Sequence, residues 1–401
     1  MTGESAMRDA YRIHLQRGRD RSVRRRHPWI FSGAIAELEA TEEARPGDLG
    51  IVLTADGTEL GCAMVNPAVP LVARVLRFDG GPIDGAYFRQ RFRRAASLRA
   101  DVIPEGTTAM RLFNAEGDGV PGLIVDRYGE FLVVQCVALG MSRLEALWLP
   151  ALEEVFAPRG ILDRTQKARH DANLDRRDRL LAGEDPGEPV WIEEDHIRHR
   201  VDLAAGQKTG LYLDQRENRR LIRSLARGRR VLNAFAYTGG FGTSAGLGGA
   251  REVVAVETSG AALEVAREDW AANGLDPAKL HCLREPAQEV LRRDEEPFDL
   301  IILDPPAFAK ERGQVERAAR AYKDVNLWAI KRLGPGAYLA TFSCSHHIDL
   351  VLFQKILFGA SIDARRPLQW ISRLGAGPDH PVHLDHPQGE YLKGFLLRAM
   401  E

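Results

Sequence analysis

The strongest constraint on the fold is a regular alternation of apolar strands and helices that begins near residue 200. The sequence predicts buried strands at 231–236, 252–257, 279–283, 298–304 and 337–343, with helices between them at 261–273, 286–293 and 315–333. Strands joined by crossover helices form a parallel sheet with helices on both faces. We therefore predict a doubly wound α/β domain, completed by a helix at 349–358 and by strands near 367–372 and 391–399.

The chain before residue 200 has a different pattern. Apolar and polar residues alternate at 50–64, around the turn Asp56-Gly57, and again at 71–78, which predicts a small antiparallel barrel or sheet. Further predicted elements are a helix at 87–100, strands near 123–125 and 131–137, a helix at 142–156 and a charged surface connection or lid at 163–188. Since 401 residues exceed one typical core, we predict a β-rich domain at 1–80, a small α+β central domain at 81–198 and the α/β domain at 199–401.

Cysteine usage and hydropathy exclude several classes of protein. The cysteines are scattered and form no CxxC pair: Cys62, Cys136, Cys282 and Cys344. This spacing argues against a zinc ribbon or a disulfide framework, and it favours a cytoplasmic protein with reduced thiols. No apolar run is long enough to span a bilayer, so we expect no membrane partner.

The net charge of −1 conceals two clusters of arginine. The first contains Arg17, Arg19, Arg21, Arg24, Arg25 and Arg26 against one acid, Asp20, and the second contains Arg89, Arg91, Arg93, Arg94 and Arg99. Such clusters suit contacts with the phosphates of a nucleic acid, but they also suit a solvated surface.

A glycine-rich turn follows the first strand of the predicted α/β domain. The candidate cofactor-binding residues of this turn are Asn233, Phe235, Tyr237, Thr238, Gly239, Gly240 and Phe241. Glycines at this place let the backbone approach a ligand at the carboxyl edge of the sheet, above a helix N-terminus. Glu257 ends the next strand, where a carboxylate can accept both hydroxyls of an adenosine ribose. The turn lacks the GxGxxG order of dinucleotide-binding proteins. The glycine-rich turn and Glu257 together therefore favour S-adenosylmethionine over NAD as the ligand.

Two further motifs follow strands that end at the same edge. Asp304-Pro305-Pro306-Ala307-Phe308 places a carboxylate before a rigid, extended turn, where it can meet the amine and ring nitrogen of a base. Ser343-Cys344-Ser345-His346-His347 places a thiol at the end of the next strand. Small polar neighbours leave this thiol accessible, and His346 or a bound cation can favour its thiolate form. We predict that Asp304 and Cys344 face one crevice.

Two other groups of residues need a function or a structural explanation. The polar stretch 206–219, which contains Thr209 and Gln215, precedes the first strand and fits either a segment that closes over the cofactor or the target base, or a solvated loop and helix start. His380, His383 and His386 recur at every third position, but Pro381 and Pro387 break any helix that would align them. No carboxylate cluster completes a coordination shell, so we expect no metal site.

Taken together, the motifs resemble those of a known family, the bacterial 23S ribosomal RNA (cytosine-C5)-methyltransferases with an N-terminal PUA domain. The resemblance covers nearly the whole chain and rests on residues 27–31, 114–123, 208–210, 213–216, 233–241, 304–308, 343–345, 379–381 and 390–393. It implies a PUA-like RNA-binding domain at 1–80, a central α+β domain at 81–198 and a class I, Rossmann-like methyltransferase domain at 199–401.

The resemblance also implies the cofactor, the partner and the roles of several residues. S-adenosylmethionine is the expected cofactor, with Thr209 and Gln215 among its contacts, and 23S ribosomal RNA or a large-subunit precursor is the expected partner. Cys344 is implied to be the nucleophile and Asp304 to support the base. One departure is Glu285-Pro286-Ala287, where such enzymes often carry an Asp-x-Phe that contacts adenine; Glu285 is the candidate for that contact. A neighbouring group of enzymes has a second cysteine in the base-binding motif, which Asp304-Pro305-Pro306-Ala307 lacks.

The expected chemistry starts from the weak nucleophilicity of cytosine carbon 5. Attack of the Cys344 thiolate on carbon 6 makes carbon 5 an enamine carbon, with Asp304 stabilising the charge or proton at ring nitrogen 3. Two alternatives remain: a nucleic-acid methyltransferase that acts on a base nitrogen, and a non-catalytic RNA-binding assembly factor. The first usually has an aromatic residue directly after the two prolines, where this chain has Ala307, and it needs no cysteine.

Overall fold

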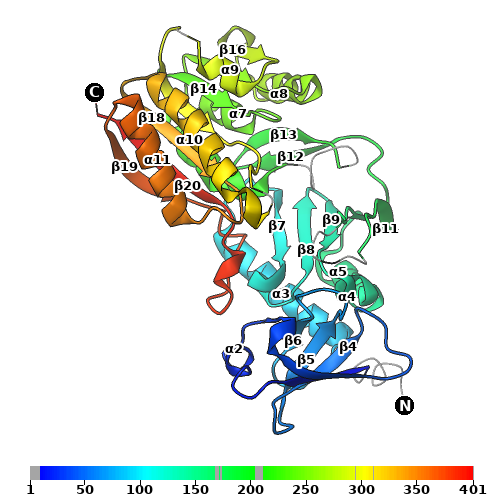
Figure 1. Cartoon of the computed structure of the whole chain (residues 1–401). Helices are drawn as coiled ribbons and strands as arrows, with labels where there is room; N and C mark the ends of the chain where they lie inside the picture. The colour runs from blue at the N-terminus through cyan, green and yellow to red at the C-terminus, as the bar shows by residue number, and fades with distance from the viewer. Residues whose placement is uncertain are drawn as a thin grey trace.

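The chain folds around three large sheets that follow one another along an elongated molecule (Figure 1). The structure, a computed structural model, describes residues 10–167, 171, 174–203, 211–293, 295–309 and 311–400. The first sheet lies at one end, the last sheet at the other end, and the second sheet between them (Figure 1). We call them the N-terminal, central and C-terminal sheets.

The N-terminal sheet has six strands in the order β2-β6-β5-β4-β1-β3. They are β1 (Tyr11–Leu15), β2 (Trp29–Ile30), β3 (Ile35–Ala40), β4 (Leu49–Leu53), β5 (Glu59–Val65) and β6 (Ala73–Arg77), with the short helix α2 (Arg21–Arg24) at its rim. β1 and β4 pair in parallel, and the other neighbours are antiparallel. The predicted turn joins β4 to β5. Gly57 takes a left-handed φ of +84° in this turn, which glycine adopts without steric cost. The β-rich character predicted for this region is confirmed.

The central sheet has five strands in the order β11-β10-β9-β8-β7. They are β7 (Ala109–Asn114), β8 (Leu123–Tyr128), β9 (Phe131–Cys136), β10 (Gly160–Asp163) and β11 (Arg179–Gly183). The helices α3 (Gly85–Val102), α4 (Leu139–Arg143) and α5 (Glu145–Phe156) cover it, with Phe92 and Trp148 fully buried in the core between them. β11 corrects the expectation of a mere surface connection at 163–188. It is an exposed edge strand without the alternation of apolar residues that would reveal it.

A two-stranded hairpin connects the central and C-terminal sheets. It consists of β12 (Val190–Glu194) and β13 (Ile197–Val201), so β13 crosses the boundary that we predict between residues 198 and 199. Ile192 packs into the core beneath Tyr128 of the central sheet. On the other side, the buried His199 Nδ1 lies 2.9 Å from the carboxylate of Asp269 in the C-terminal part. The hairpin therefore packs against both the central and the C-terminal part of the molecule. The boundaries of the three domains stay a prediction.

The C-terminal sheet has seven strands in the order β16-β15-β14-β17-β18-β20-β19. They are β14 (Arg230–Ala234), β15 (Glu252–Val256), β16 (Leu280–Leu283), β17 (Phe298–Leu303), β18 (Leu333–Ser343), β19 (Leu368–Leu374) and β20 (Lys393–Ala399). The first five in spatial order are parallel, and β20 is antiparallel to both of its neighbours. The doubly wound α/β prediction is confirmed.

Helices cover both faces of the C-terminal sheet. One face packs against α6 (Arg216–Leu225), α7 (Gly240–Leu247) and α8 (Gly260–Ala272), and the other against α9 (Ala287–Leu291), α10 (Val315–Lys331) and α11 (Leu350–Ala364). Both faces of the parallel strands are therefore buried, which explains their continuous apolar runs. In the described ranges, each helix is too short or too polar to cross a membrane.

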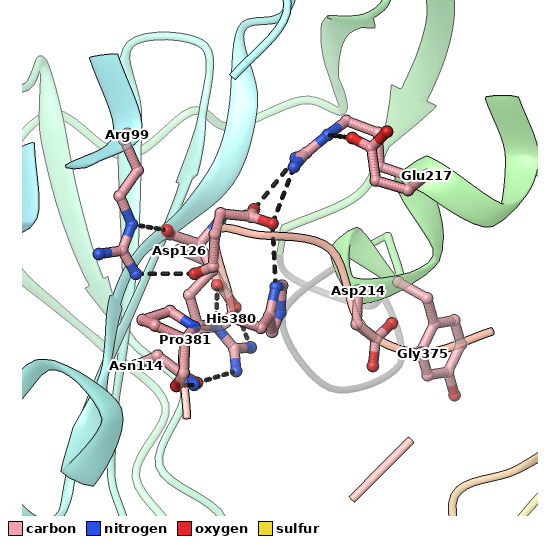
Figure 2. A network of polar contacts seen from close by, with 12 residues as sticks. Arg99, Asn114, Asp126, Asp214, Glu217, Gly375, His380 and Pro381 are labelled. Atoms are coloured by element: carbon pink, nitrogen blue, oxygen red, sulfur yellow. Dashed lines mark hydrogen bonds and ion pairs between the residues drawn. The ribbon is translucent and has the colours of Figure 1, made fainter. Parts of the chain in front are cut away.

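The segment after β19 returns to the central sheet (Figure 2). It buries a carboxylate between the central sheet and the helix α6 of the C-terminal part. Asp379, which is fully buried, accepts two hydrogen bonds from the Arg216 guanidinium, at 2.8 and 3.0 Å. It also accepts the backbone N–H of Arg111 at 2.9 Å, and the His380 Nδ1 lies 3.1 Å from it. The carbonyl of Asp379 accepts a hydrogen bond from Arg99 at 2.7 Å. Asp379 thus joins α6 to α3 and β7.

The same segment continues to the N-terminal sheet. The Pro381 carbonyl accepts a hydrogen bond of 3.0 Å from Asn114. Five residues later, the buried ring of His386 packs edge-on against Trp29, with ring centroids 4.4 Å apart. Trp29 in turn donates from Nε1 to Glu116 of the central region at 2.8 Å. Residues 379–386, which we call the strap, therefore contact all three large sheets or their adjoining loops.

We predict that Asp379→Ala lowers the free energy of unfolding by about 3–5 kcal/mol, because it leaves Arg216 buried without its partner. Urea unfolding at pH 7 measures the loss. The matched control is Asp363→Ala, which breaks an exposed pair with Lys323 and should cost at most about 1 kcal/mol. Equal losses in the two variants would show that the strap does not depend on this carboxylate.

The loss in Asp379→Ala should also depend on pH. Burial alone would raise the pKa of Asp379, but the hydrogen bonds and charges of His380 and Arg216 outweigh burial and hold this pKa well below its usual range. A lowered carboxyl pKa stabilises the fold above the unfolded pKa, and this contribution is lost as the pH falls. The difference between wild type and Asp379→Ala should thus be full at pH 7 and shrink below about pH 4.

Candidate active site

A cavity of about 670 Å³ opens where the parallel strands of the C-terminal sheet end. Its lining includes the predicted site residues Gln215, Phe235, Tyr237, Thr238, Gly240, Phe241, Glu257, Glu285, Asp304 and Cys344. These residues come from the segments after β14, β15, β16, β17 and β18, and from the segment before α6. The carboxyl edge of a parallel sheet is the usual ligand site of this fold class, so the cavity lies where the sequence predicts it.

The turn between β14 and α7 holds an unusual backbone. Phe235 and Tyr237 both take left-handed φ angles, of +59° and +50°, which side chains other than glycine rarely adopt. Gly239 has φ +75°, and a Cβ at this position would lie 2.7 Å from the Cβ of Ala266. Non-glycine residues in such conformations gather at ligand sites, where the surrounding structure holds them. The turn presents the N-terminus of α7 to the cavity.

Glu257 binds this turn from the end of β15. Its Oε2 accepts the backbone N–H of Tyr237 at 3.0 Å, and its Oε1 accepts the N–H groups of Thr258 and Ser259 at 2.7 and 3.1 Å. Oε2 accepts only the Tyr237 bond within the part of the chain that the structure describes, so it can also accept a hydroxyl. The carboxylate at the rim of the cavity, beside a helix N-terminus, therefore fits the ribose of S-adenosylmethionine.

Two of the predicted cofactor contacts do not line the cavity. Asn233 is buried and lies outside the cavity lining, close to where a Cβ on Gly242 would point. Gly239 also lies outside the lining, so both residues support the turn instead of facing the cavity. Thr209 lies outside the described residues. Glu285 does face the cavity, where it forms an ion pair with Arg293 of the loop after α9.

The two predicted catalytic residues do meet at one place. Asp304 and Cys344 both line the cavity, and the Cys344 Sγ lies 4.0 Å from the carbonyl of Pro305, which directly follows Asp304. Gln215 donates from its side chain to the Asp304 carboxylate at 3.0 Å. This contact gives Gln215 a role that the sequence did not indicate: it orients Asp304.

A network of hydrogen bonds behind Cys344 fixes its loop. The buried Ser345 Oγ accepts the backbone N–H of Ala309 at 3.2 Å and lies 2.9 Å from the Tyr322 hydroxyl. The Ser345 carbonyl accepts a hydrogen bond of 2.8 Å from the Nζ of Lys393. Ala309 lies in the loop that begins at Asp304, so Ser345 connects this loop to the loop of Cys344. The roles of Tyr322 and Lys393 were not predicted, because each lies far from the motifs in sequence.

Two tyrosines and a carboxylate complete the cavity, and the sequence analysis assigned them no role. Burial and the neighbouring charges of Asp304, Tyr237, Cys344 and Asp214 raise the pKa of Tyr212 above its usual value. Burial, followed by Asp214, also raises the pKa of Tyr391, whose hydroxyl donates to Asp214 at 2.5 Å. Both tyrosines are thus neutral near pH 7 and offer ring faces and hydroxyl groups to a ligand.

A second hollow lies on the N-terminal sheet. It has a volume of about 890 Å³, and its lining includes Arg19, Arg21, Arg25, Trp29 and Phe31, together with Asp385 next to the strap residue His386. Phe31 is 49% exposed, so its ring is available for stacking. The first arginine cluster therefore surrounds a concave surface with aromatic residues. We call it the basic hollow.

The second arginine cluster is bound mainly to the protein itself. Arg99 is buried in its bond to Asp118 at 2.6 Å, and the Arg91 guanidinium lies over the ring of Tyr87. Arg89 and Arg93 both pair with Glu154. Arg99 cannot contact a phosphate because it is buried, so the prediction is wrong for this residue. The arginine pattern along the helix did not show which face of the helix is buried.

The histidines at 380, 383 and 386 serve the strap. His380 contacts Asp379, and His386 packs against Trp29. His383 pairs with Asp385 at 2.6 Å. Among the described residues, no three histidine, cysteine, aspartate or glutamate side chains are placed to hold a metal ion.

Comparison with known proteins agrees with this geometry. Residues 159–397 match the S-adenosylmethionine-dependent methyltransferase family, and residues 13–78 match the PUA-like domain family. The chain is therefore an S-adenosylmethionine-dependent methyltransferase with an N-terminal PUA-like domain. The methyltransferase match begins before residue 199, at β10, and so includes the hairpin β12–β13.

A more specific assignment follows from full-length relatives. The ribosomal RNA large subunit methyltransferase I of Erwinia tasmaniensis is 42% identical over 395 residues, which cover 97% of this chain and 99% of the relative. The chain belongs to this family. Among solved structures, a Streptococcus mutans protein assigned to the SAM-dependent methyltransferases shares the fold, with a TM-score of 0.83 and 21% identity over 96% of this chain and 99% of its own. A methyltransferase structure with the same TM-score, identity and coverage contains SAH.

We predict that Glu257→Gln weakens S-adenosylmethionine binding at least about tenfold, because hydrogen bonds to a charged group contribute roughly 1.5–3 kcal/mol. Isothermal titration of the whole enzyme measures the affinity. The control is Glu264→Gln on the exposed side of α8, where the carboxylate pairs with Arg267 and should not matter. Unchanged affinity in Glu257→Gln, or tighter binding of NAD than of S-adenosylmethionine, would contradict the assignment.

Proposed function

We propose that this enzyme methylates carbon 5 of a cytosine in RNA, and that the RNA is 23S ribosomal RNA or a precursor of the large subunit. The observation that carries the proposal is the meeting of Cys344 and Asp304 in the cavity that also contains Glu257 and the strained turn. The names of the relatives support a ribosomal RNA substrate. A structure of the same fold contains SAH, which supports S-adenosylmethionine as the cofactor.

The attack on the cytosine and the activation of its ring each have a residue in the cavity. S-adenosylmethionine supplies an electrophilic methyl group. The Cys344 thiolate adds to carbon 6 of the cytosine, which makes carbon 5 nucleophilic, and Asp304 holds the proton at ring nitrogen 3. After carbon 5 is methylated, a water molecule takes its proton, and the electron pair left behind restores the double bond between carbons 5 and 6. The bond between carbon 6 and Cys344 then breaks, and Cys344 leaves as the thiolate. Gln215 keeps the Asp304 carboxylate in place, with its 3.0 Å hydrogen bond.

The cytosine has to leave its stack before it can reach Cys344. Extrusion costs a few kcal/mol in a duplex and less in an unpaired loop. Tyr212 and Tyr391 line the cavity and are both half-buried, so their rings offer surfaces against which an extruded base can stack. The aromatic ring that amine-directed enzymes place directly after the two prolines is replaced by Ala307, and the ring of Phe308 packs against Tyr322 with centroids 4.7 Å apart. This arrangement favours carbon over nitrogen as the methyl acceptor.

We predict that Cys344→Ser abolishes methylation but leaves cofactor and RNA binding intact, because a hydroxyl ionises far less than a thiol near neutral pH. The wild-type enzyme should form a covalent adduct with RNA that contains 5-fluorocytosine, since fluorine replaces the proton that has to leave. Denaturing electrophoresis shows the adduct as a band of reduced mobility.

The matched control is Cys282→Ser, which changes the other half-exposed cysteine, outside the cavity lining. It should methylate and trap RNA like the wild type. An adduct that persists in Cys344→Ser would assign the attack to another residue. Methylation of a base nitrogen, or cofactor binding without any methylated RNA, would support one of the two alternative functions.

We also propose that the basic hollow binds unpaired RNA. Arg19, Arg21 and Arg25 can contact phosphates, and Phe31 and Trp29 can stack with bases. The hollow is concave and combines positive charge with aromatic rings, as surfaces that bind single strands do.

We predict that the triple change of Arg19, Arg21 and Arg25 to Gln weakens RNA binding and flattens its salt dependence. Each lost phosphate contact should reduce the slope of log K against log salt by about 0.7–0.9. Filter binding at several salt concentrations measures both quantities. The control, Arg267→Gln, lies on α8 at the other end of the molecule and should keep the wild-type slope (Figure 1). An unchanged slope in the triple variant would remove the hollow from the RNA interface.

A further inference from the structure

Lys393 is a buried lysine next to the catalytic loop. It begins β20 and lies opposite Ser343 in the pairing with β18, one residue before Cys344. Its side chain is buried, although lysine is almost never buried without a partner. Since opposed residues of an antiparallel pair project to the same face, the lysine reaches the loop from the side of Ser343 and Ser345.

The recorded bond of Lys393 satisfies only part of its ammonium group. Nζ donates to the Ser345 carbonyl at 2.8 Å, and within the described ranges no ion pair with an aspartate or glutamate is recorded for it. An ammonium group carries three donors and a full charge, and a carbonyl oxygen neutralises no charge. Burial of a cation is costly unless a negative group lies close by.

Three acidic groups act electrostatically on Lys393, and Cys344 is one of them. Burial lowers the pKa of Lys393, and Cys344 is the largest influence in the opposite direction, ahead of Glu390 and Asp349. Glu390 and Asp349 both lie outside the cavity lining, and Asp349 is engaged at the N-terminus of α11, where it accepts the N–H of Leu352. On the cavity side, Tyr212 acts on both Cys344 and Asp304, which lines the same cavity, and Tyr322 of α10 also lies near Cys344. Among these groups Lys393 is the cation.

We propose that the ammonium group of Lys393 stabilises the thiolate form of Cys344, as a positioning residue that acts through the nucleophile without touching the RNA. The thiol proton leaves to solvent, Lys393 keeps its own proton, and no covalent bond changes at the lysine. The sequence suggested that His346 favours the thiolate form, and this proposal assigns that role to Lys393. His346 is exposed and packs against His347. The attack of the Cys344 thiolate on cytosine rests on the proposed function. The effect of Lys393 on the ionisation of Cys344 does not depend on it.

The test measures the ionisation of Cys344 directly. The full-length enzyme, without RNA or cofactor, is alkylated with iodoacetamide between pH 5 and 10, and mass spectrometry follows the peptide that contains Cys344. The midpoint of the rate against pH should lie below the ordinary thiol value of about 8.5. In Lys393→Met the midpoint should rise by about one unit or more, and in Lys393→Arg, which keeps the charge, it should remain below the ordinary value.

Two controls separate electrostatic stabilisation from support of the loop. Tyr322→Phe removes the hydroxyl that contacts Ser345 but keeps the cation, so it should leave the Cys344 midpoint unchanged. In every sample, Cys62 and Cys136 report folding because they are fully buried and react only when the chain opens. Cys282, whose pKa is raised by burial, should keep the same midpoint in all variants.

Several outcomes would overturn the proposal. They are a wild-type midpoint at or above the ordinary thiol value, equal midpoints in wild type and Lys393→Met, and a rise in Tyr322→Phe as large as in Lys393→Met. If Lys393→Met unfolds and exposes Cys62 and Cys136, the proposal is tested by the wild type and by Lys393→Arg. A Cys344 midpoint at or above the ordinary thiol value in either of them would overturn it. A low midpoint together with no trapping of 5-fluorocytosine RNA would refute the proposed function alone.

Discussion

Asp379 carries its charge in the interior, where it is tolerated only because Arg216, the backbone of Arg111 and His380 surround it. Since each donor comes from a different element, the carboxylate holds the strap, α6 and β7 in one arrangement. From Asp379 the chain runs along the strap to the contact of His386 with Trp29, and it then continues to Tyr391 in the cavity and to Lys393 at the start of β20. A buried ion pair of this kind adds little net stability compared with apolar packing, but it permits few alternative arrangements. Asp379 is therefore one of the contacts that fix the basic hollow relative to the cavity of the C-terminal sheet.

The cavity itself depends on connections between its loops. Ser345 bonds to the loop of Asp304 through Ala309, while Gln215 bonds to Asp304 from the segment before α6. Glu257 in the same way holds the left-handed turn at Tyr237. A site in which each reacting group is held by a neighbouring loop loses little conformational entropy when a substrate binds. The polar residues beside the motifs are thus as important to the geometry as the motifs themselves.

The parts that sequence predicted well are those with local signals. The parallel strands have continuous apolar runs, and the ends of β15, β17 and β18 marked Glu257, Asp304 and Cys344. Contacts between distant segments left no such signal. Lys393 is 49 positions after Cys344 and becomes its neighbour only through the pairing of β20 with β18. Arg99 looked like a surface arginine because its partners, Asp118 and the Asp379 carbonyl, come from loops whose positions the helix pattern does not contain. β11 was missed because an exposed edge strand needs no apolar alternation.

The sheet order has a consequence for the growing chain. β20 is made after β19, yet it lies between β18 and β19, so β18 has an open edge during synthesis until β20 arrives. Chains fold largely from the N-terminus as they emerge, so the PUA-like domain can form while the edge of β18 is still open. An open, apolar strand edge is prone to wrong pairing with other chains. A ribosome that stalls between β19 and β20 would therefore release a fragment that has a folded PUA-like domain but lacks the strand that begins at Lys393. Chaperones or proteases would have to remove this fragment.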